Sequence, residues 1–195
     1  MRRIVMFNSV SADGYFAGAD GNLDWVVHDS ELDGGVAGSL GGSDTMLFGR
    51  KTYDMFESYW PTAVDEAPHA KGVRSPEIKA MGVWINNANK IVFSKSRKEV
   101  TWKNSRLVKE FDPREIEAIK QQPGKSIMVF GSGTLVSQLT QHGLIDEYQF
   151  IVSPVILGSG KSLINGVPKL ARLKLEDSKT FRTGVVMLRY SRASQ

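Results

Sequence analysis

The chain has 195 residues and no cysteine. This absence excludes disulfide bonds, thiolate metal sites and a cysteine nucleophile. Histidine is also scarce, and none of the three (His28, His69 and His142) has acidic or histidine partners at the spacing of metal ligands. The sequence therefore predicts no metal site.

Long hydrophobic runs are missing too. A membrane-spanning helix needs about 20 consecutive apolar residues, and no stretch approaches that length. Arg2 and Arg3 mimic the start of a signal peptide, but Asn8 and Ser9 interrupt the apolar segment that follows them. We therefore expect no membrane association and no export, and the cytoplasm is the expected location.

A strong charge imbalance is absent. The net charge is +4 and the pI is near 9.3, but the basic residues gather only in the short segments 95–103 and 169–179. Glu99, Glu176 and Asp177 interrupt these two segments. Nucleic-acid binding normally needs a contiguous basic face, so it is not expected. A small phosphorylated ligand needs only two or three of these charges.

The hydrophobic pattern predicts alternating strands and helices. At 41% hydrophobic residues, the chain can build a sizeable core, and we expect a single domain over residues 1–195. Apolar runs predict strands that are covered on both faces, which is typical of a parallel sheet. The expected strands are 3–10, 45–48, 90–93 and 127–130, and the expected helices are 29–40, 52–59, 76–86 and 112–122. Such βαβα alternation implies right-handed crossovers around a central sheet.

The last third of the chain has a different pattern. It contains three β-rich runs at 147–155, 169–180 and 185–192, the last two joined through Arg182-Thr183-Gly184. Hairpin strands pair in antiparallel fashion, so an antiparallel edge is expected on the sheet. The polar segment 61–75, rich in Pro, Ala and Gly, is the best candidate for a long surface loop.

The strand at 127–130 runs directly into Gly131-Ser132-Gly133 and then into a helical pattern. A helix start offers unpaired N–H groups, and glycine lets an anion approach the backbone, so this turn is a candidate phosphate site. The Rossmann fingerprint is incomplete, because Val136 stands where a third Gly or Ala is required and Asp146 comes before the next strand. The sequence thus favours a nucleotide-binding α/β sheet of another type.

A second glycine-rich segment, Gly158-Ser159-Gly160-Lys161-Ser162, resembles the end of a Walker A loop. The full motif needs glycine five positions before Gly160, and that residue is Val155. The segment continues into Asn165-Gly166-Val167-Pro168, which is a poor helix start. A P-loop ATPase is therefore rejected.

Six motifs, taken in order, resemble the dihydrofolate reductase-like superfamily. The resemblance covers essentially the whole chain and is closest to the C-terminal reductase domain of bifunctional riboflavin-biosynthesis deaminase-reductases. The motifs are Ser11–Gly18, Gly21–Trp25, Leu47–Tyr53, Val129–Thr134, Gly143–Tyr148 and Pro154–Gly160. The resemblance implies a three-layer αβα fold with a mixed, mostly parallel sheet, an NADPH-dependent reductase with a small-molecule substrate, and a homodimer. Because the chain starts at the reductase strand, we expect either that any deaminase is a separate protein or that the substrate differs.

The resemblance also implies which residues contact the cofactor. Loops that follow three strands match the family's phosphate-binding loops, and the segment 11–18 matches its flexible lid over the nicotinamide. Their basic residues favour NADPH over NADH, because Lys and Arg stabilise the 2′-phosphate. The expected cofactor-binding residues are Ala12, Gly18, Gly49, Arg50, Lys51, Thr52, Ser94, Lys95, Ser96, Gly131, Ser132, Gly133 and Thr134.

The proton donor is less clearly marked. Reduction of a carbon–nitrogen double bond needs a proton on nitrogen, which a carboxyl group with a raised pKa or a held water can supply. The candidates are Asp13, Asp29 and Glu31, with His28 beside them and Trp25 as a wall of the substrate pocket. None matches the folate-reductase carboxylate cleanly, which weakens the case for dihydrofolate as substrate.

Two other functional classes stay open at this stage. The first is an NADP(H)-binding regulatory or interaction module without turnover, favoured by the unclear proton donor. The second is nucleic-acid binding through the basic loops, which would be steeply salt-dependent. A reductase of a ribosylaminopyrimidine or pterin-like substrate is the preferred hypothesis.

Overall fold

The fold is described from a computed structural model, for residues 1–27, 31–32, 34, 41–63 and 76–193. Most of the expected helix at 29–40 and of the expected loop at 61–75 lies outside these residues, as do His28, Asp29 and His69. Among the described helices, none is long and apolar enough to cross a membrane.

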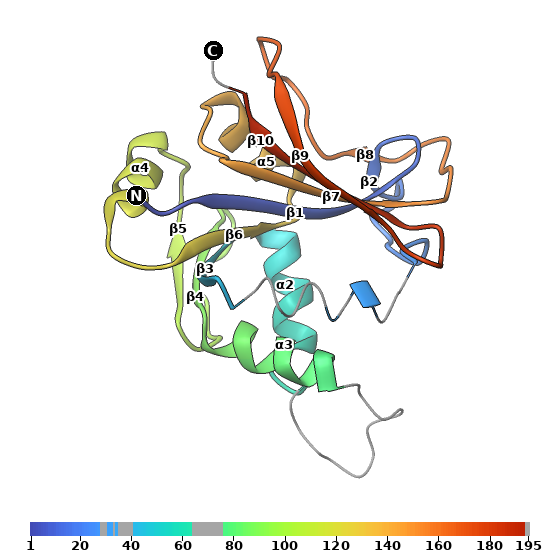
Figure 1. The fold of residues 1–195 in the computed structure, drawn as a ribbon. Coiled ribbons are helices and arrows are strands. Elements are labelled where there is room, and N and C mark those ends of the chain that lie inside the picture. The colour runs from blue at the N-terminus through green and yellow to red at the C-terminus, as the bar shows by residue number, and fades with distance from the viewer. Residues whose placement is uncertain (28–30, 33, 35–40, 64–75, 194–195) are drawn as a thin grey trace.

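A central sheet of eight strands organises the molecule (Figure 1). The strand order is β5-β4-β3-β6-β1-β7-β10-β9. The strands are β1 (Ile4–Ser11), β3 (Ser43–Gly49), β4 (Asn89–Phe93), β5 (Ser105–Val108), β6 (Ser126–Phe130), β7 (Glu147–Ser153), β9 (Leu173–Thr180) and β10 (Val186–Arg192). The first six strands in this order, from β5 through to β7, run parallel to one another. Strand β10 is antiparallel to both β7 and β9. The predicted antiparallel edge is confirmed.

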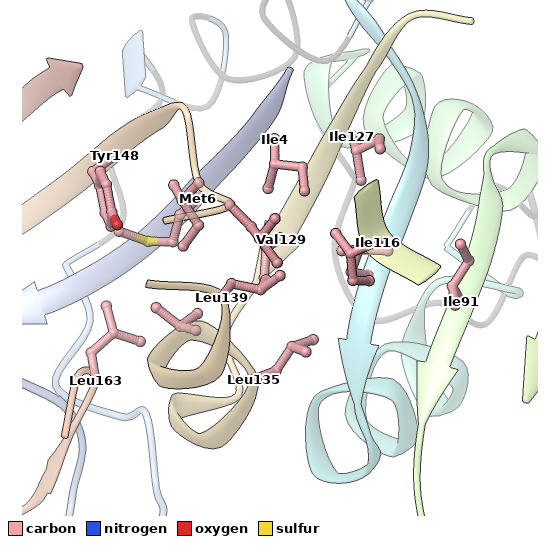
Figure 2. Packing of buried hydrophobic residues seen from close by; sticks show 14 of the residues in the cluster. Ile4, Met6, Ile91, Ile116, Ile127, Val129, Leu135, Leu139, Tyr148 and Leu163 are labelled. Atoms are coloured by element: carbon pink, nitrogen blue, oxygen red, sulfur yellow. The ribbon is translucent and has the colours of Figure 1, made fainter. Parts of the chain in front are cut away.

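Helices cover both faces of the sheet, α2 and α3 on one face and α4 and α5 on the other (Figure 1). They are α2 (Arg50–Tyr59), α3 (Pro76–Asn87), α4 (Pro113–Gln121) and α5 (Gly133–Gln141). Strand residues alternate between these layers, as the twofold side-chain period of a strand requires. On β6, Ile127 and Val129 pack with α4 and α5 (Figure 2), while Met128 joins the cluster on the opposite face. The three-layer αβα architecture is confirmed.

The hairpin between β9 and β10 forms where the sequence predicts it. The Phe181 amide donates to the Val185 carbonyl at 2.8 Å, and Gly184 has a φ of 84°, a left-handed conformation that favours glycine. Strand β9 starts at Leu173, four residues later than the expected 169.

Three short strands are not predicted by the sequence pattern. One is β5; the other two, β2 (Tyr15–Ala17) and β8 (Lys161–Ser162), pair with each other in a separate two-stranded sheet. Because Lys161 and Ser162 form a strand and not the start of a helix, the segment cannot act as a P-loop.

Candidate functional site

The candidate site lies along one edge of the sheet. Because β4, β3, β6 and β1 are adjacent and parallel, their carboxyl ends meet at this edge. The loops that leave them are 94–97, 49–52, 131–134 and 12–14. At about 4.8 Å per strand, the four loops span about 14 Å. This row of loops can accommodate an extended ligand and not only a single phosphate.

The loops at 49–52 and 131–134, which we call the glycine loops, contact each other. A Cβ atom on Gly49 would lie 2.0 Å from Ser132 Oγ and 2.6 Å from Ser132 Cβ. One on Gly131 would lie 2.9 Å from Thr52 Oγ1. Since real Cβ atoms do not approach other heavy atoms so closely, both positions require glycine. The close approach brings the starts of α2 and α5 together.

Both helix starts lack a side-chain cap. The N-cap residues Gly49 and Ser132 make no side-chain capping hydrogen bond, and neither helix has an acidic residue in its first turn. Helix α4 is different: the Asp112 side chain accepts a hydrogen bond from the Arg114 amide at 2.9 Å, and Glu115 lies in the first turn. The starts of α2 and α5 therefore keep free amides and a positive dipole end, which stabilise an anion.

A small ionic network lies beside the start of α2. Arg50 pairs with Asp54 at 3.4 Å, and Arg97 pairs with Glu57 at 2.9 Å and with Asp54 at 3.5 Å. The guanidinium of Arg97 also lies 4.8 Å from the centre of the Tyr53 ring. Burial is the largest single effect and raises the Glu57 pKa, but the hydrogen bonds from Arg97, Tyr53 and Thr101 and the charge of Arg97 together lower it below its ordinary value. Arg97 is the last residue of the loop 94–97, which the resemblance matches to a phosphate-binding loop, although the expected contact residues name only the first three positions of that loop.

The loop after β4 holds three more of the predicted cofactor residues. Ser94 is buried, and its Oγ accepts from the Arg97 amide at 3.0 Å, so this side chain shapes the loop. Ser96 Oγ lies 3.5 Å from Ser94 Oγ. Lys95 extends into solvent and forms an exposed ion pair with Glu110 at 3.5 Å. Within the described part of the chain, no carboxylate pairs with Lys51, so its charge is available to an anion.

Asp13 fastens the predicted lid to the loop that follows β7. Its carboxylate accepts hydrogen bonds from Ser11 Oγ at 2.6 Å, from the Gly158 amide at 2.8 Å and from the Leu157 amide at 3.2 Å. The Ser11 bond is the largest of the effects that lower the Asp13 pKa. The Ala12 amide donates to the Val155 carbonyl at 2.8 Å. A lowered pKa favours the ionised form, which is unfavourable for a proton donor.

The lid is held on two further sides. Its strand β2 pairs with β8, and the Gly18 amide donates to the Asn22 carbonyl at 3.0 Å. A Cβ atom on Gly133 would lie 3.0 Å from the Ser162 carbonyl oxygen and 3.1 Å from Phe16 Cε1. The start of α5, where Gly133 and Thr134 lie, is therefore in contact with both β2 and β8.

Two of the remaining predicted residues, Trp25 and Glu31, lie within the described part of the chain. Trp25 is half-buried, and its Nε1 atom is buried without a hydrogen-bond partner in the described structure. The Glu31 side chain is 57% exposed and forms an ion pair with Lys179 at 2.7 Å. Asp29 lies outside the described residues. Among those that are described, no group of three acidic or histidine side chains could hold a metal ion.

Comparisons with known proteins agree with the fold. The model of the RibD C-terminal domain matches residues 2–187. Two proteins of Bacillus subtilis (strain 168), both described as uncharacterized, are similar over nearly their whole length. YyaP is 31% identical over 189 residues, covering 97% of this chain and 94% of YyaP. YwjB is 30% identical over 193 residues, covering 98% and 99%.

Solved structures show the same architecture. A putative riboflavin biosynthesis protein from Shewanella sp. PV-4 aligns with a TM-score of 0.74 at 22% identity, with full coverage of both chains. A pyrimidine reductase-like protein from Corynebacterium diphtheriae aligns with a TM-score of 0.68 at 14% identity, covering all of this chain and 93% of that one.

A bifunctional deaminase and 5-amino-6-(5-phosphoribosylamino)uracil reductase from Thermotoga maritima aligns with a TM-score of 0.64 at 17% identity. This alignment covers 98% of the present chain and 57% of the Thermotoga chain. The likeness establishes a dihydrofolate reductase-like fold. From the match over residues 2–187 and the two relatives of similar length, the chain belongs to the RibD C-terminal domain family, a riboflavin-pathway reductase-like family.

Proposed function

We propose that the protein is an NADPH-dependent reductase of a carbon–nitrogen double bond in a pyrimidine- or pterin-like heterocycle. The observation that carries the proposal is the contact between Gly49 and Ser132, which joins two uncapped helix starts beside Arg50 and Lys51. Free amides and cations at one place suit the phosphates of a dinucleotide. When bound, NADPH would supply the hydride.

The residues of this edge have distinct roles in the proposal. The amides at the starts of α2 and α5 hold the pyrophosphate, and Arg50, Lys51 and Arg97 hold the 2′-phosphate. The lid, fastened by Asp13 to the loop after β7, excludes water from the reacting end of the cofactor. The predicted role of Asp13, Asp29 or Glu31 as proton donor stays a prediction.

A second candidate is a protein that binds NADP(H) without turnover. The hydrogen bonds of Asp13 favour it, because three donors hold this carboxylate in the ionised form. Steady oxidation of NADPH with any heterocyclic substrate would exclude this alternative.

The test of the proposed function is direct binding followed by turnover. We expect NADPH to bind with micromolar affinity and NADH to bind about tenfold or more weakly, since NADH lacks the 2′-phosphate. Oxidation would be followed at the nicotinamide absorbance with a panel of pterins and ribosylaminopyrimidines. Absence of NADPH binding would contradict the cofactor assignment, and binding without oxidation of any probe would favour the second candidate.

Asp54→Asn sharpens the same test. Asp54 contacts both Arg50 and Arg97, so removing its charge frees Arg50 for the phosphate and leaves Arg97 paired with Glu57 alone. The variant should bind NADPH several-fold more tightly and NADH as the wild type does. Asp177→Asn is the matched control, because Asp177 pairs with Arg189 on the distant β9–β10 hairpin. Equal effects of both variants would contradict the assignment of the 2′-phosphate.

We further propose that the protein forms a homodimer through the β7, β10 and β9 end of the sheet. On the face of the sheet that carries α5, the side chains at this end are apolar. They include Phe150, Val152, Leu188, Tyr190 and Leu175. Leu175 is 51% exposed, and all eight residues of β9 are exposed. Exposed apolar area on an edge strand is typical of an interface between subunits.

Leu175→Asp should convert the dimer into a monomer, because it places a charge in the apolar contact. The mass would be measured by light scattering after size-exclusion chromatography. Val83→Asp is the control, since Val83 is also exposed but lies on α3, on the other side of the sheet. A monomeric wild-type protein, or a dimeric Leu175→Asp variant, would contradict this interface.

A further inference from the structure

The loop after β8 carries the one asparagine of the chain that is followed by glycine, Asn165-Gly166. An asparagine can lose ammonia without an enzyme when the backbone nitrogen of the next residue attacks its side-chain carbonyl carbon. A side chain on that next residue hinders the attack, and glycine has none. The dipeptide is therefore a candidate site of covalent modification.

The loop is anchored to α5 on both sides of the reacting atoms. The Asn165 amide donates to Ser137 Oγ at 2.9 Å, and the Gly166 carbonyl accepts from Gln141 Nε2 at 2.8 Å. Leu163 belongs to the buried cluster that α5 helps to form (Figure 2). A chemical change in the loop is therefore transmitted directly to α5.

The reacting groups themselves are held weakly. Both residues are exposed. Within the described part of the chain, the Gly166 amide donates no hydrogen bond, and a Cβ atom on Gly166 would meet nothing within 4 Å. The Asn165 side chain donates to the Ser162 carbonyl at 3.3 Å, slightly beyond the usual range for such a bond. Water can therefore reach the dipeptide, and its atoms have room to move.

Deamidation places a negative charge beside the start of α5. The Ser162 carbonyl oxygen, which accepts from the Asn165 side chain, lies 3.0 Å from the position of a Cβ atom on Gly133, the first residue of α5. A carboxylate at position 165 cannot donate to this carbonyl and repels its oxygen. Its charge also opposes the binding of an anion at the positive end of the α5 dipole.

We propose that Asn165 is a site of spontaneous deamidation and that the product binds the cofactor more weakly. The effect on the cofactor rests on the proposed function, whereas the modification does not. The Gly166 nitrogen gives its proton to hydroxide and bonds to Asn165 Cγ, the Cγ–Nδ2 bond breaks, and Nδ2 takes a proton from water and leaves as ammonia. Water then opens the succinimide at either carbonyl and yields aspartate or isoaspartate.

Peptide mapping of the stored protein tests the modification. The protein is kept warm in a mildly alkaline buffer, and trypsin then releases residues 162–169 as one peptide for mass spectrometry. We expect aspartate and isoaspartate to accumulate several-fold faster at Asn165 than at Asn104, which is also exposed but precedes a residue of strand β5. Equal rates at the two positions, or no product at Asn165, overturn the proposal.

Asn165→Asp tests the effect on the site. It should bind NADPH about threefold or more weakly than the wild type, and the ratio should shrink at high salt, which screens the charge. Asn104→Asp is the matched control, because it makes the same change at the amino end of β5, on the opposite edge of the sheet. Wild-type affinity in Asn165→Asp, or an equal loss in Asn104→Asp, overturns the proposal.

Storage connects the two measurements. Stored wild-type protein should lose NADPH affinity in step with its modified fraction. Asn165→Gln, whose longer side chain cyclises far more slowly, should keep the affinity of its own fresh sample, and an equal loss in this variant contradicts the proposal.

Thermal melting separates this inference from the proposed function, because it needs no cofactor. Asn165→Asp should melt at a lower temperature than Asn104→Asp, since the Ser162 carbonyl loses its donor. If the wild type binds no NADPH, the proposed function fails, and peptide mapping and melting then decide the inference. Equal melting of the two variants would overturn it.

Discussion

Gly49→Ala is expected to weaken NADPH binding by about tenfold or more. The added methyl group would lie 2.6 Å from Ser132 Cβ. The Ser132 hydroxyl can rotate away, but its Cβ is fixed by the backbone, so the two loops must separate. Separation pulls apart the two helix starts that share the phosphate site. The dissociation constant of NADPH would be measured by fluorescence titration.

Ser132→Gly in the same chain should restore binding. It removes both Ser132 atoms that collide with the new methyl group, and the next nearest, Ser132 Cα, lies at 3.9 Å, an ordinary contact. Ser132 also has a φ of 63°, which glycine adopts without strain. The single variant Ser132→Gly is therefore expected to bind NADPH like the wild type.

Two results would contradict this account. If Gly49→Ala binds NADPH normally, the loop contact is not part of the site. If the double variant remains as weak as Gly49→Ala, the methyl group acts by filling space needed by the cofactor. A thermal melt of each variant separates these effects from a loss of folding.

The sequence predicts the row of loops at the carboxyl ends of the parallel strands. This arrangement depends on the strands and on the glycines that follow them. Long apolar runs predict β1, β4, β6 and β7, and parallel strands place their carboxyl ends at the same edge whatever else the chain does. The glycines at 49 and 131–133 then mark where loops approach closely. The resemblance to reductases added the expectation that the ligand is NADPH.

Short strands escape prediction because little of their surface is buried. Strand β5 has only four residues, Ser105–Val108, of which one is exposed and three are half-buried. Strands β2 and β8 have three and two residues. Their pairing depends on the lid meeting the loop after β7, which is a contact between distant segments, and no local pattern carries that information.

The ionic partners of the site are equally hidden in the sequence. Arg97 follows β4, and its partners Asp54 and Glu57 lie on α2, so the pairing appears only once α2 packs beside the loop. Asp13 illustrates the same point. It lies 144 residues before Leu157, from whose amide it accepts a hydrogen bond. That contact depends on β1 and β7 being neighbours in the sheet.

Lys90 provides a pH-dependent test of the core on the α2 and α3 side of the sheet. It lies on β4 with 1% of its surface exposed, and its ammonium donates to the carbonyls of Asn86 at 3.1 Å, Ala88 at 2.9 Å and Lys103 at 3.2 Å. The ring centre of Trp102 is 4.3 Å away. Burial, helped by the charge of Lys103, lowers the Lys90 pKa from 10.5 to about 8.

The lowered pKa predicts that alkaline pH relieves a destabilising charge. Between pH 8 and 10.5 the unfolded chain holds a proton on Lys90 that the folded protein has released, so the free energy of unfolding rises with pH in this interval. At about 1.4 kcal/mol per pKa unit, the gain over this interval is at most about 3.5 kcal/mol. Below pH 8 both states are protonated and the contribution of Lys90 is constant.

The measurement is urea unfolding of the wild type and of Lys90→Met at several pH values from 7 to 10. Other groups titrate in both proteins and largely cancel, so the difference between the two free energies isolates Lys90. We expect this difference to shift in favour of the wild type above pH 8. A difference that stays flat to pH 10 would mean that the three carbonyl acceptors keep the ammonium charged, because they offset the cost of its burial.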